Sequence, residues 1–308
     1  MGNKLPSQPR ALILYNPAAG QASNVIQSLE MAANIWRSNG WEVELRPTKA
    51  PGDATIQAHA ATTIGYHVVA AAGGDGTVNE VINGLVGTKT ALAVLPMGTV
   101  NIWARELGLP MDVKKAASAF LQAKLAQIDL GKAGKRHFLL MAGIGFDGAV
   151  TEVIRPKEKK LLGALAYVKQ AVQLGLRFRG VSTHIRIDGK RVRGKVLMVV
   201  IGNSQLYGGV FKLTANAIVN DGLLDICVIK GRSMFEAPFR LLSIFTKRYN
   251  RDPRVEYFQG KKIQIKGKKL LAVQIDGDYL GKTPMNFEVV PGGLSVLVPK
   301  SVDKSLWI

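Results

Sequence analysis

Short apolar runs alternate with longer amphipathic stretches over roughly the first 130 residues of the chain. Each apolar run ends at a turn signal, which predicts β-strands over residues 11–15, 42–45, 68–72 and 91–95. Between the first two runs, Val25, Leu29 and Trp36 recur at helical spacing and Gly40 closes the segment, so a helix is expected there. This alternation predicts a mostly parallel sheet with helices on both faces.

The pattern changes after about residue 132, where strand-like runs follow one another closely. They cover residues 183–187, 195–202, 223–229, 262–266, 272–275 and 294–298. Two stretches with helical spacing, 161–176 and 233–248, interrupt them. The predicted fold class is therefore α/β with two domains: a Rossmann-like nucleotide-binding α/β domain followed by a β-sandwich.

The composition agrees with a compact chain, and the sequence lacks the patterns of a membrane-spanning, secreted or myristoylated protein. The 308 residues are 47% hydrophobic with a mean hydropathy of +0.11, which is typical of two packed domains. The apolar runs are too short for a transmembrane helix, and the N-terminus has neither a signal-peptide core nor a myristoylation pattern. We expect a cytoplasmic, unlipidated protein in which Cys227 is a buried apolar residue.

A formal net charge of +19 implies a polyanionic partner. An anionic membrane, a nucleic acid and a phosphorylated small molecule would all satisfy this charge. The basic residues are dispersed among strand-like segments, where a solvated surface and a membrane-facing patch remain open readings. Aromatic and basic residues do not interleave as they do in single-strand binders, so no nucleic-acid partner is expected.

The segment 69–82 carries the most informative motif. A strand passes through Gly73-Gly74-Asp75-Gly76-Thr77 into a helix that is expected to begin near Thr77. Glycines let backbone N–H groups approach phosphate oxygens, and a helix N-terminus adds partial positive charge. Asp75 could then hold Mg²⁺ or its water. A purely structural strand-to-helix corner is the alternative.

Two further strand ends carry compatible signals. Asn16-Pro17 with Gly20 follows the first strand, and Gly98-Thr99-Val100-Asn101 follows the fourth. Either segment alone could be a simple turn, but loops at the carboxyl edge of an open α/β sheet gather where ligands bind. The three loops together predict one nucleotide cleft, although the Walker, dinucleotide and protein-kinase motifs are absent.

These motifs, together with Asn79-Glu80, resemble the catalytic domain shared by diacylglycerol, sphingosine and ceramide kinases, and the bacterial members most of all. The resemblance continues through the second half and so covers essentially the whole chain. Its later motifs are Gly143-Ile144-Gly145-Phe146-Asp147, Asn220-Asp221-Gly222-Leu223-Leu224-Asp225, and Ile275-Asp276-Gly277-Asp278 followed by Pro284.

The resemblance implies an active site between two domains and ATP with Mg²⁺ as cofactors. The implied boundaries are residues 1–131, with about 296–308 returning to them, and residues 132–295. It implies an ATP site lined by Asn16, Pro17, Gly20, Thr48, Gly73, Gly74, Asp75, Gly76, Thr77, Asn79, Glu80, Gly98, Thr99 and Asn101. Its catalytic residues would be Asp75 and Asp129, which organise magnesium, and Asp276, the general base.

Asp278 is a further candidate metal ligand, and Asp221 a candidate for a second, structural magnesium, although both also fit ordinary turns. The chain departs from the usual family pattern at Val100 and Ile102, where a glycine and an acid are common, and at Asp278, where glutamate is usual. The four histidines receive no catalytic role, and Trp103 is kept as a residue near the cleft.

The expected function is an ATP- and magnesium-dependent lipid kinase, cytoplasmic and peripherally membrane-associated, whose partner is a lipid substrate at an anionic membrane surface. Diacylglycerol is the first candidate substrate, while a sphingoid base, a ceramide and a monoacylglycerol remain open, as does a homodimer. The alternatives are an NAD kinase-like small-molecule kinase and a catalytically idle module that binds nucleotides or nucleic acid.

Overall fold

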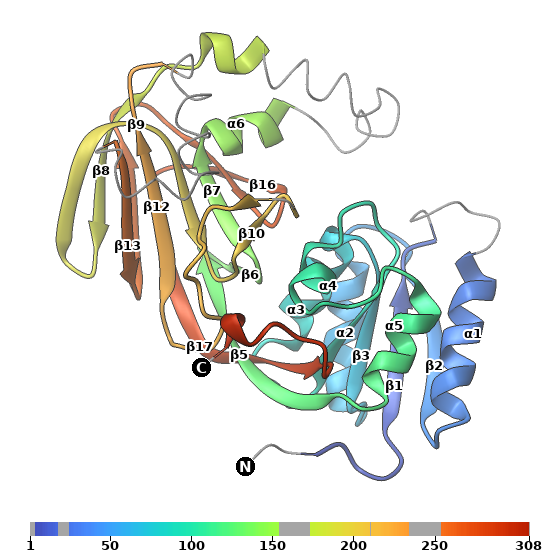
Figure 1. The fold of residues 1–308 in the computed structure, drawn as a ribbon. Helices are drawn as coiled ribbons and strands as arrows, with labels where there is room; N and C mark the ends of the chain where they lie inside the picture. Colours follow the sequence, from blue (N-terminus) through green and yellow to red (C-terminus); the bar gives the residue numbers. More distant parts are fainter. Residues whose placement is uncertain (1–3, 18–24, 154–172, 210, 234–253, 308) are drawn as a thin grey trace.

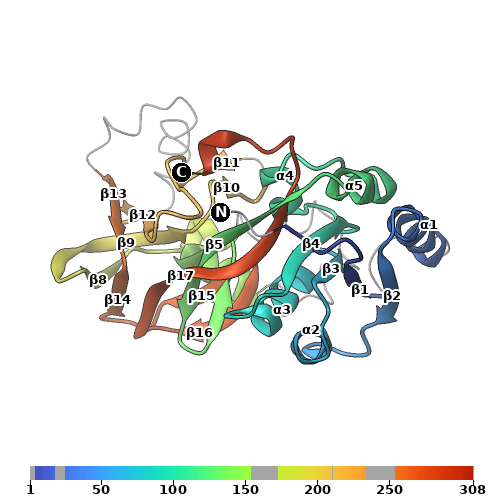
Figure 2. The same cartoon turned by 90° about the horizontal axis from the view of Figure 1, so that it is seen from below.

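The computed structural model describes residues 4–17, 25–153, 173–209, 211–233 and 254–307. Its first domain is a parallel sheet in the order β4-β3-β1-β2. Helices α1 and α5 pack together on one face, and α2 and α3 on the other (Figure 2). The elements are β1 (Arg10–Tyr15), α1 (Val25–Arg37), β2 (Glu42–Pro47), α2 (Asp53–Thr63), β3 (Val68–Gly73), α3 (Asp75–Leu85), β4 (Ala91–Pro96), α4 (Ile102–Glu106) and α5 (Val113–Phe120).

The predicted strands and first helix are confirmed, and their burial explains the pattern. Every residue of β3 and β4 is buried, as expected for central parallel strands covered on both faces. In α1 the apolar stripe that includes Leu29 and Trp36 faces inward. Trp36 stacks on Trp41 with ring centroids 4.9 Å apart, and its Nε1 donates to the Ala117 carbonyl at 2.8 Å, which ties α1 to α5.

The second domain is built mainly from antiparallel strands, which confirms the predicted β-rich half (Figure 1). Strands β16-β15-β7-β9-β8-β14-β17 lie in that order, and β12 and β13 extend the sheet from β9. The elements are β5 (Lys124–Ala133), β6 (Arg136–Phe138), β7 (Met141–Gly145), α6 (Phe146–Val153), β8 (Val181–Ile187), β9 (Lys190–Gly202), β10 (Leu206–Tyr207), β11 (Phe211–Lys212), β12 (Leu224–Lys230), β13 (Val255–Gly260), β14 (Lys262–Gly267), β15 (Ala272–Ile275), β16 (Asp278–Lys282), β17 (Met285–Val298) and the 3₁₀ turn η3 (Lys304–Leu306).

The two predicted helical insertions fall mostly outside the described residues. Residues 161–172 and 234–248 are among those that the structure does not describe, whereas residues 173–177 are helical. Within the described ranges, no helix is both long enough and apolar enough to cross a membrane.

Two long strands join the domains. The first part of β17 pairs with β14 in the second domain, and its last part pairs with β4 of the first domain through Val296 and Leu92. Strand β5 lies antiparallel beside β17 along both parts, with an irregularity between Val290 and Leu294 (Figure 2). One sheet is therefore continuous across the two domains. The predicted boundaries at 131/132 and 295/296 fall inside these strands.

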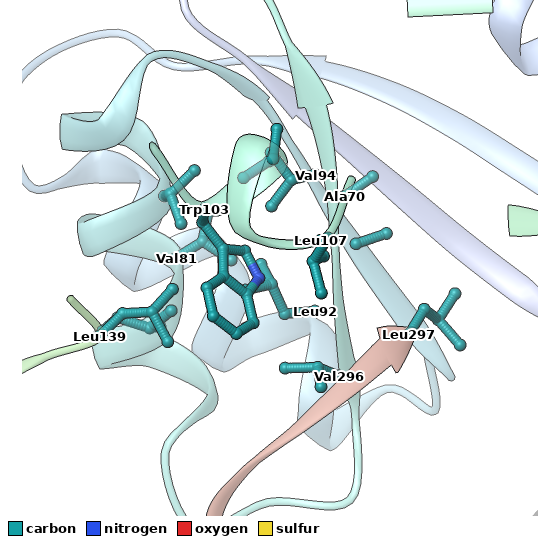
Figure 3. Packing of buried hydrophobic residues seen from close by; sticks show 14 of the residues in the cluster. Ala70, Val81, Leu92, Val94, Trp103, Leu107, Leu139, Val296 and Leu297 are labelled. Carbon is teal, nitrogen blue, oxygen red and sulfur yellow. The ribbon is translucent and has the colours of Figure 1, made fainter. Parts of the chain in front are cut away.

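Trp103 belongs to the core of the first domain. Its side chain is 1% exposed and lies among Val81, Leu92, Val94 and Leu107 (Figure 3). It therefore anchors α4 and is not available as a platform for substrate. Sequence reasoning had left this position open because Trp103 directly follows a cleft loop.

Candidate active site

The glycine loop joins β3 to α3 at the carboxyl edge of the parallel sheet. Helix α3 begins at Asp75, two residues before the predicted start, with extended Gly74 as its N-cap. Gly73 is fixed by packing, because a Cβ at this position would collide with the side chain of Thr77. The N-terminal end of α3, with its partial positive charge, therefore opens directly onto the loop.

The loop after β4 lies against this glycine loop. A Cβ on Gly98 would lie 2.5 Å from the Gly74 Cα, so the two backbones approach as closely as glycine allows. Asn101, at φ 51°, holds the loop closed: its Oδ1 accepts from the Gly98 N–H at 3.0 Å, and its Nδ2 donates to the Gly98 carbonyl at 2.7 Å. The structure thus brings together two of the loops that the sequence predicts to share a cleft, and Thr99, in the second of these loops, is exposed.

Asn16 and Thr48 lie at the adjacent strand ends. The Asn16 N–H donates to the Ala72 carbonyl at 3.3 Å, and the Thr48 N–H donates to the Tyr15 carbonyl at 2.8 Å. The carboxyl ends of β1, β2 and β3 therefore meet beside the glycine loop. Pro17 is exposed next to Asn16, and Gly20 lies outside the described residues.

Asp75 connects the glycine loop to α4. Its Oδ1 accepts from the Ile102 N–H at 2.7 Å. Burial raises the pKa of the Asp75 carboxyl, an effect opposed by the amides of Ile102 and Asn101 and by the charge of Arg105. Burial penalises the negative charge of such a carboxylate, so it gains from a cation placed beside it.

The departure at Val100 creates a contact between the domains. A Cβ on Gly209 of the second domain would lie 2.6 Å from Val100 Cγ1. Valine therefore packs where the usual glycine would leave space. At Ile102 the usual acidic side chain is absent, and the backbone N–H of this residue donates to Asp75.

Asn79 was predicted to line the ATP site, but its side chain faces the second domain. It is 2% exposed. Its Nδ2 donates to Asp276 Oδ2 at 2.8 Å and to the His137 carbonyl at 3.2 Å, and its Oδ1 accepts from Arg136 Nη2 at 2.7 Å. All of its hydrogen-bonding atoms are thus used to join α3 to the second domain.

Glu80 was also predicted for the ATP site, and the structure gives it a different partner. Its Oε2 accepts from the Ala54 N–H at 3.2 Å, and its carbonyl accepts from Thr55 Oγ1 at 2.8 Å. Helix α2 begins after Gly52, which has no side chain to cap it. Glu80 supplies the missing acceptor and ties α2 to α3.

Asp276 occupies a tight turn at φ 47° and accepts four hydrogen bonds. Its Oδ1 accepts from the N–H groups of Leu140 at 2.9 Å and Met141 at 3.0 Å. Its Oδ2 accepts from the Leu139 N–H and from Asn79 Nδ2, both at 2.8 Å. Burial raises the pKa of the Asp276 carboxyl, and these donors oppose the rise. Four donors fill the acceptor sites of a carboxylate, so its predicted role as a base requires one donor to leave.

Asp129 is buried, and both of its oxygens are occupied by backbone groups. Oδ2 accepts from the Gly222 N–H at 2.6 Å and Oδ1 from the Gly292 N–H at 2.7 Å. Burial and then the charge of Asp129 raise the pKa of Asp221, while burial and then Asp221 raise the pKa of Asp225 to about 6. Asp129 therefore belongs with the turn that carries Asp221, and it pins that turn to β17.

The predicted magnesium ligands do not form one cluster. In the part of the chain that the structure describes, no three acidic, histidine or cysteine side chains are close enough to hold a metal ion together. Each oxygen of Asp129 accepts one backbone N–H, and Asp278 lies 3.5 Å from Arg136. Mg²⁺ in phosphate-transferring sites is usually held by one or two carboxylates together with substrate phosphates. Asp75 beside the glycine loop fits that arrangement.

Sequence reasoning missed a polar chain behind Asp276. Asp147, on α6, accepts from the Tyr207 hydroxyl and from Gln274 Nε2, the latter at 2.7 Å. Gln274 Oε1 in turn accepts from the Gly277 N–H at 2.7 Å. Gly143 leaves room for the Asp147 carboxylate, because a Cβ there would overlap it. The glycine-rich motif that ends in Asp147 was the available signal.

Glu106 was missed as well. This buried residue of α4 accepts from the N–H groups of Gln205 at 2.8 Å and Leu206 at 2.6 Å, which lie in the second domain. Burial raises the pKa of the Glu106 carboxyl, and those amides oppose the rise. A lone acid in a short helix gives no sequence signal for such a contact.

Comparison with known proteins identifies relatives over both domains. Residues 10–133 match the family model described as diacylglycerol kinase catalytic domain, and residues 141–298 match the YegS C-terminal NAD kinase beta sandwich-like domain. A diacylglycerol kinase from Bacillus subtilis (strain 168) is 30% identical over 306 residues, which cover 96% of this chain and 99% of the relative. The diacylglycerol kinase from Staphylococcus carnosus (strain TM300) is 29% identical and covers 96% and 97%, respectively. A crystal structure of a diacylglycerol kinase from Bacillus anthracis str. Sterne superposes with a TM-score of 0.78 at 25% identity, covering 96% of this chain and 98% of its own.

Proposed function

Because the chain belongs to the diacylglycerol kinase family, we propose that it is an ATP- and magnesium-dependent lipid kinase that transfers the γ-phosphoryl group of ATP to a lipid hydroxyl. Diacylglycerol is the first candidate acceptor, since the relatives carry that name. Supporting the proposal most directly is the close approach of Gly98 to Gly74 at the N-terminus of α3. A glycine backbone at a helix N-terminus, with no Cβ atoms in the way, suits phosphate oxygens.

In this mechanism the chain mainly positions and neutralises charge. The N-terminal end of α3 and the glycine backbone bind the phosphates, because phosphoryl transfer depends chiefly on alignment and electrostatic stabilisation. Mg²⁺, when bound beside Asp75, would neutralise charge on the phosphate oxygens. The loop stapled by Asn101 keeps the two glycine backbones in contact and preserves this surface.

Asp276 is the proposed proton acceptor for the lipid hydroxyl. Three of its four donors are backbone N–H groups of residues 139–141, next to it in the second domain, while the fourth is Asn79 of the first domain. A change in the spacing of the domains would withdraw the Asn79 donor and leave Oδ2 able to accept a proton. We therefore propose that the carboxylate becomes a base as the domains separate to admit the lipid.

One observation favours a second candidate. The family model for residues 141–298 is described as NAD kinase beta sandwich-like, so phosphorylation of NAD is the alternative reaction. It would use the same glycine loop but a nucleotide hydroxyl as acceptor. The two reactions differ only in the acceptor, and a substrate panel separates them.

The test measures transfer of labelled phosphate from ATP, with magnesium, to a panel of lipids in mixed micelles and in parallel to NAD. We expect a labelled lipid with the native protein and loss of label with Asp75→Ala and Asp276→Ala. Glu30→Ala, which removes an exposed acid on α1, is the control and should retain transfer. Labelled NAD without labelled lipid would replace the proposed function by its alternative, and no transfer to any acceptor would overturn both.

A further inference from the structure

The outer face of strands β8, β9 and β14 carries one sign of charge. Side chains alternate along these strands, and the inward set, which includes Ile185, Val192 and Ile263, is buried in the core. The outward set contains no acid. Its members are Ser182, His184 and Arg186 on β8, Arg191, Arg193 and Lys195 on β9, and Lys262, Gln264 and Lys266 on β14.

Strand register places several of these side chains directly opposite one another. Arg186 pairs with Arg191, and His184 lies between Arg193 on one side and Lys266 on the other. Like charges directly opposite each other destabilise a sheet. Within the described ranges, no side chain of this outward set forms an ion pair. This face therefore carries positive charge without interspersed acids, whereas most protein surfaces mix both signs of charge.

The same side chains surround a shallow hollow of about 280 Å³. Arg186, Arg191, Arg193 and Lys266 line it together with His184. Neighbouring strands lie about 5 Å apart, and side chains on one face repeat about every 7 Å along a strand. Cations with this spacing can contact several phosphate groups of one plane at the same time. A single small anion is too small to contact all of them.

We propose that this basic face of β8, β9 and β14 docks the enzyme on the phosphate groups of an anionic membrane. The inference rests on the proposed function, because a lipid kinase has to meet its acceptor at a lipid surface. Charge complementarity identifies the partner as a polyanionic plane. In both ribbon views, β8 and β9 lie at the end of the second domain that is remote from the first domain (Figures 1 and 2). A membrane docked there leaves the glycine loops of the first domain accessible to ATP.

The experiment measures binding of the full chain to sedimenting vesicles of phosphatidylglycerol and phosphatidylcholine at low salt. The test variant is Arg186→Gln/Arg191→Gln/Arg193→Gln. The matched control, Lys89→Gln/Lys114→Gln/Lys115→Gln, removes the same charge from exposed positions of the first domain. Each basic residue near an anionic surface contributes about fivefold to partitioning, so the test variant should bind about a hundredfold more weakly. The control should change binding by only a few fold.

Equal weakening by the two triple variants would overturn the proposal, since net charge alone would then explain binding. Thermal unfolding checks that the test variant is folded, and it should melt no lower than the native chain because like-charge repulsion has been relieved. Lys266→Gln supplies an independent, smaller change, expected to be about fivefold.

Two further arms identify the source of the anion. Inorganic phosphate should displace the protein from vesicles no better than chloride at equal ionic strength, and stronger displacement by phosphate would indicate a small-anion site instead. Membrane docking would also be overturned if the test variant lost binding to a short DNA duplex but kept its binding to vesicles.

Kinase activity separates failure of this inference from failure of the proposed function. For the test variant, the ratio of activity on vesicles to activity on neutral mixed micelles should fall, and for the control it should stay constant. If neither variant nor the native chain phosphorylates any lipid, the proposed function fails, while the vesicle-binding comparison still decides whether the basic face docks.

Discussion

Replacing Asp276 by asparagine tests the four-donor arrangement around this carboxylate. Asparagine keeps the shape of the side chain but turns one acceptor oxygen into an NH₂ group. Whichever way the amide faces, two donors lose their acceptor: the N–H groups of Leu140 and Met141, or those of Leu139 and Asn79. Each donor left unpaired in a buried site costs about 1–3 kcal/mol. Because Asp276 is only partly buried, we expect a loss of about 3 kcal/mol in the free energy of unfolding.

Urea unfolding followed by tryptophan fluorescence measures this loss. Asp278→Asn is the matched control, because this neighbouring aspartate has a side chain 45% exposed and an ion pair with Arg136 at 3.5 Å. Exposed ion pairs contribute less than about 1 kcal/mol. If Asp276→Asn destabilises the protein no more than Asp278→Asn, the inferred donor arrangement is refuted.

The same variant bears on catalysis. Loss of a general base lowers turnover by about 10²–10⁴-fold, which is the expectation for Asp276→Asn. Asn79→Ala removes one donor but keeps the carboxylate, so it should lower turnover far less. Equal losses in the two variants would show that Asp276 acts by holding the domains together and not as a base.

Three further predictions follow from local geometry. Gly98→Ala should weaken ATP binding at least about tenfold and lower the melting temperature, because its Cβ would lie 2.5 Å from the Gly74 Cα. The control is Gly76→Ala, which should leave the melting temperature nearly unchanged because no atom lies within 4 Å of the added Cβ. Equal shifts of the melting temperature in the two variants would contradict the close approach of Gly98 to Gly74. Because the pKa of Asp225 is raised to about 6 in the folded chain, its contribution to stability should decline by about 3 kcal/mol as the pH rises from about 4 to above 6. Urea unfolding across this range, with chelator present, should therefore show a decline that is smaller by about 3 kcal/mol in Asp225→Asn than in the native chain, and an equal decline in the two would contradict the raised pKa. Glu106→Leu should destabilise the protein by at least about 1–3 kcal/mol, because the amides of Gln205 and Leu206 both donate to Glu106 Oε1 and would lose this shared acceptor, and differential scanning calorimetry would detect the shift.

The features that the sequence predicts well are those set by local pattern. Strands β3 and β4 are continuous apolar runs because both faces of a central parallel strand are buried, and the glycine motifs mark their ends. The close approach of Gly74 and Gly98 could be anticipated, because parallel strand ends must gather at one edge.

Roles that depend on distant partners could not be predicted in this way. Asn79 bonds to Asp276, 197 positions away, and Asp129 bonds to the amides of Gly222 and Gly292. A backbone N–H gives no sequence signal, because nearly every residue has one. Polar residues of a shared motif can therefore look alike in sequence, although some face the nucleotide loops and others hold the two domains together.

The paired strands β5 and β17 also limit how the enzyme can be divided and deformed. Since both strands contribute hydrogen bonds to each half, a truncation at residue 131 or 295 would cut through a ladder and expose two unpaired edges, which favours aggregation. Neither half is therefore an exchangeable module. The two halves can therefore move relative to each other only as far as this two-stranded ribbon bends and twists, and the irregularity between Val290 and Leu294 is the place where it can bend. The ribbon resists such movement, whereas a flexible linker would not.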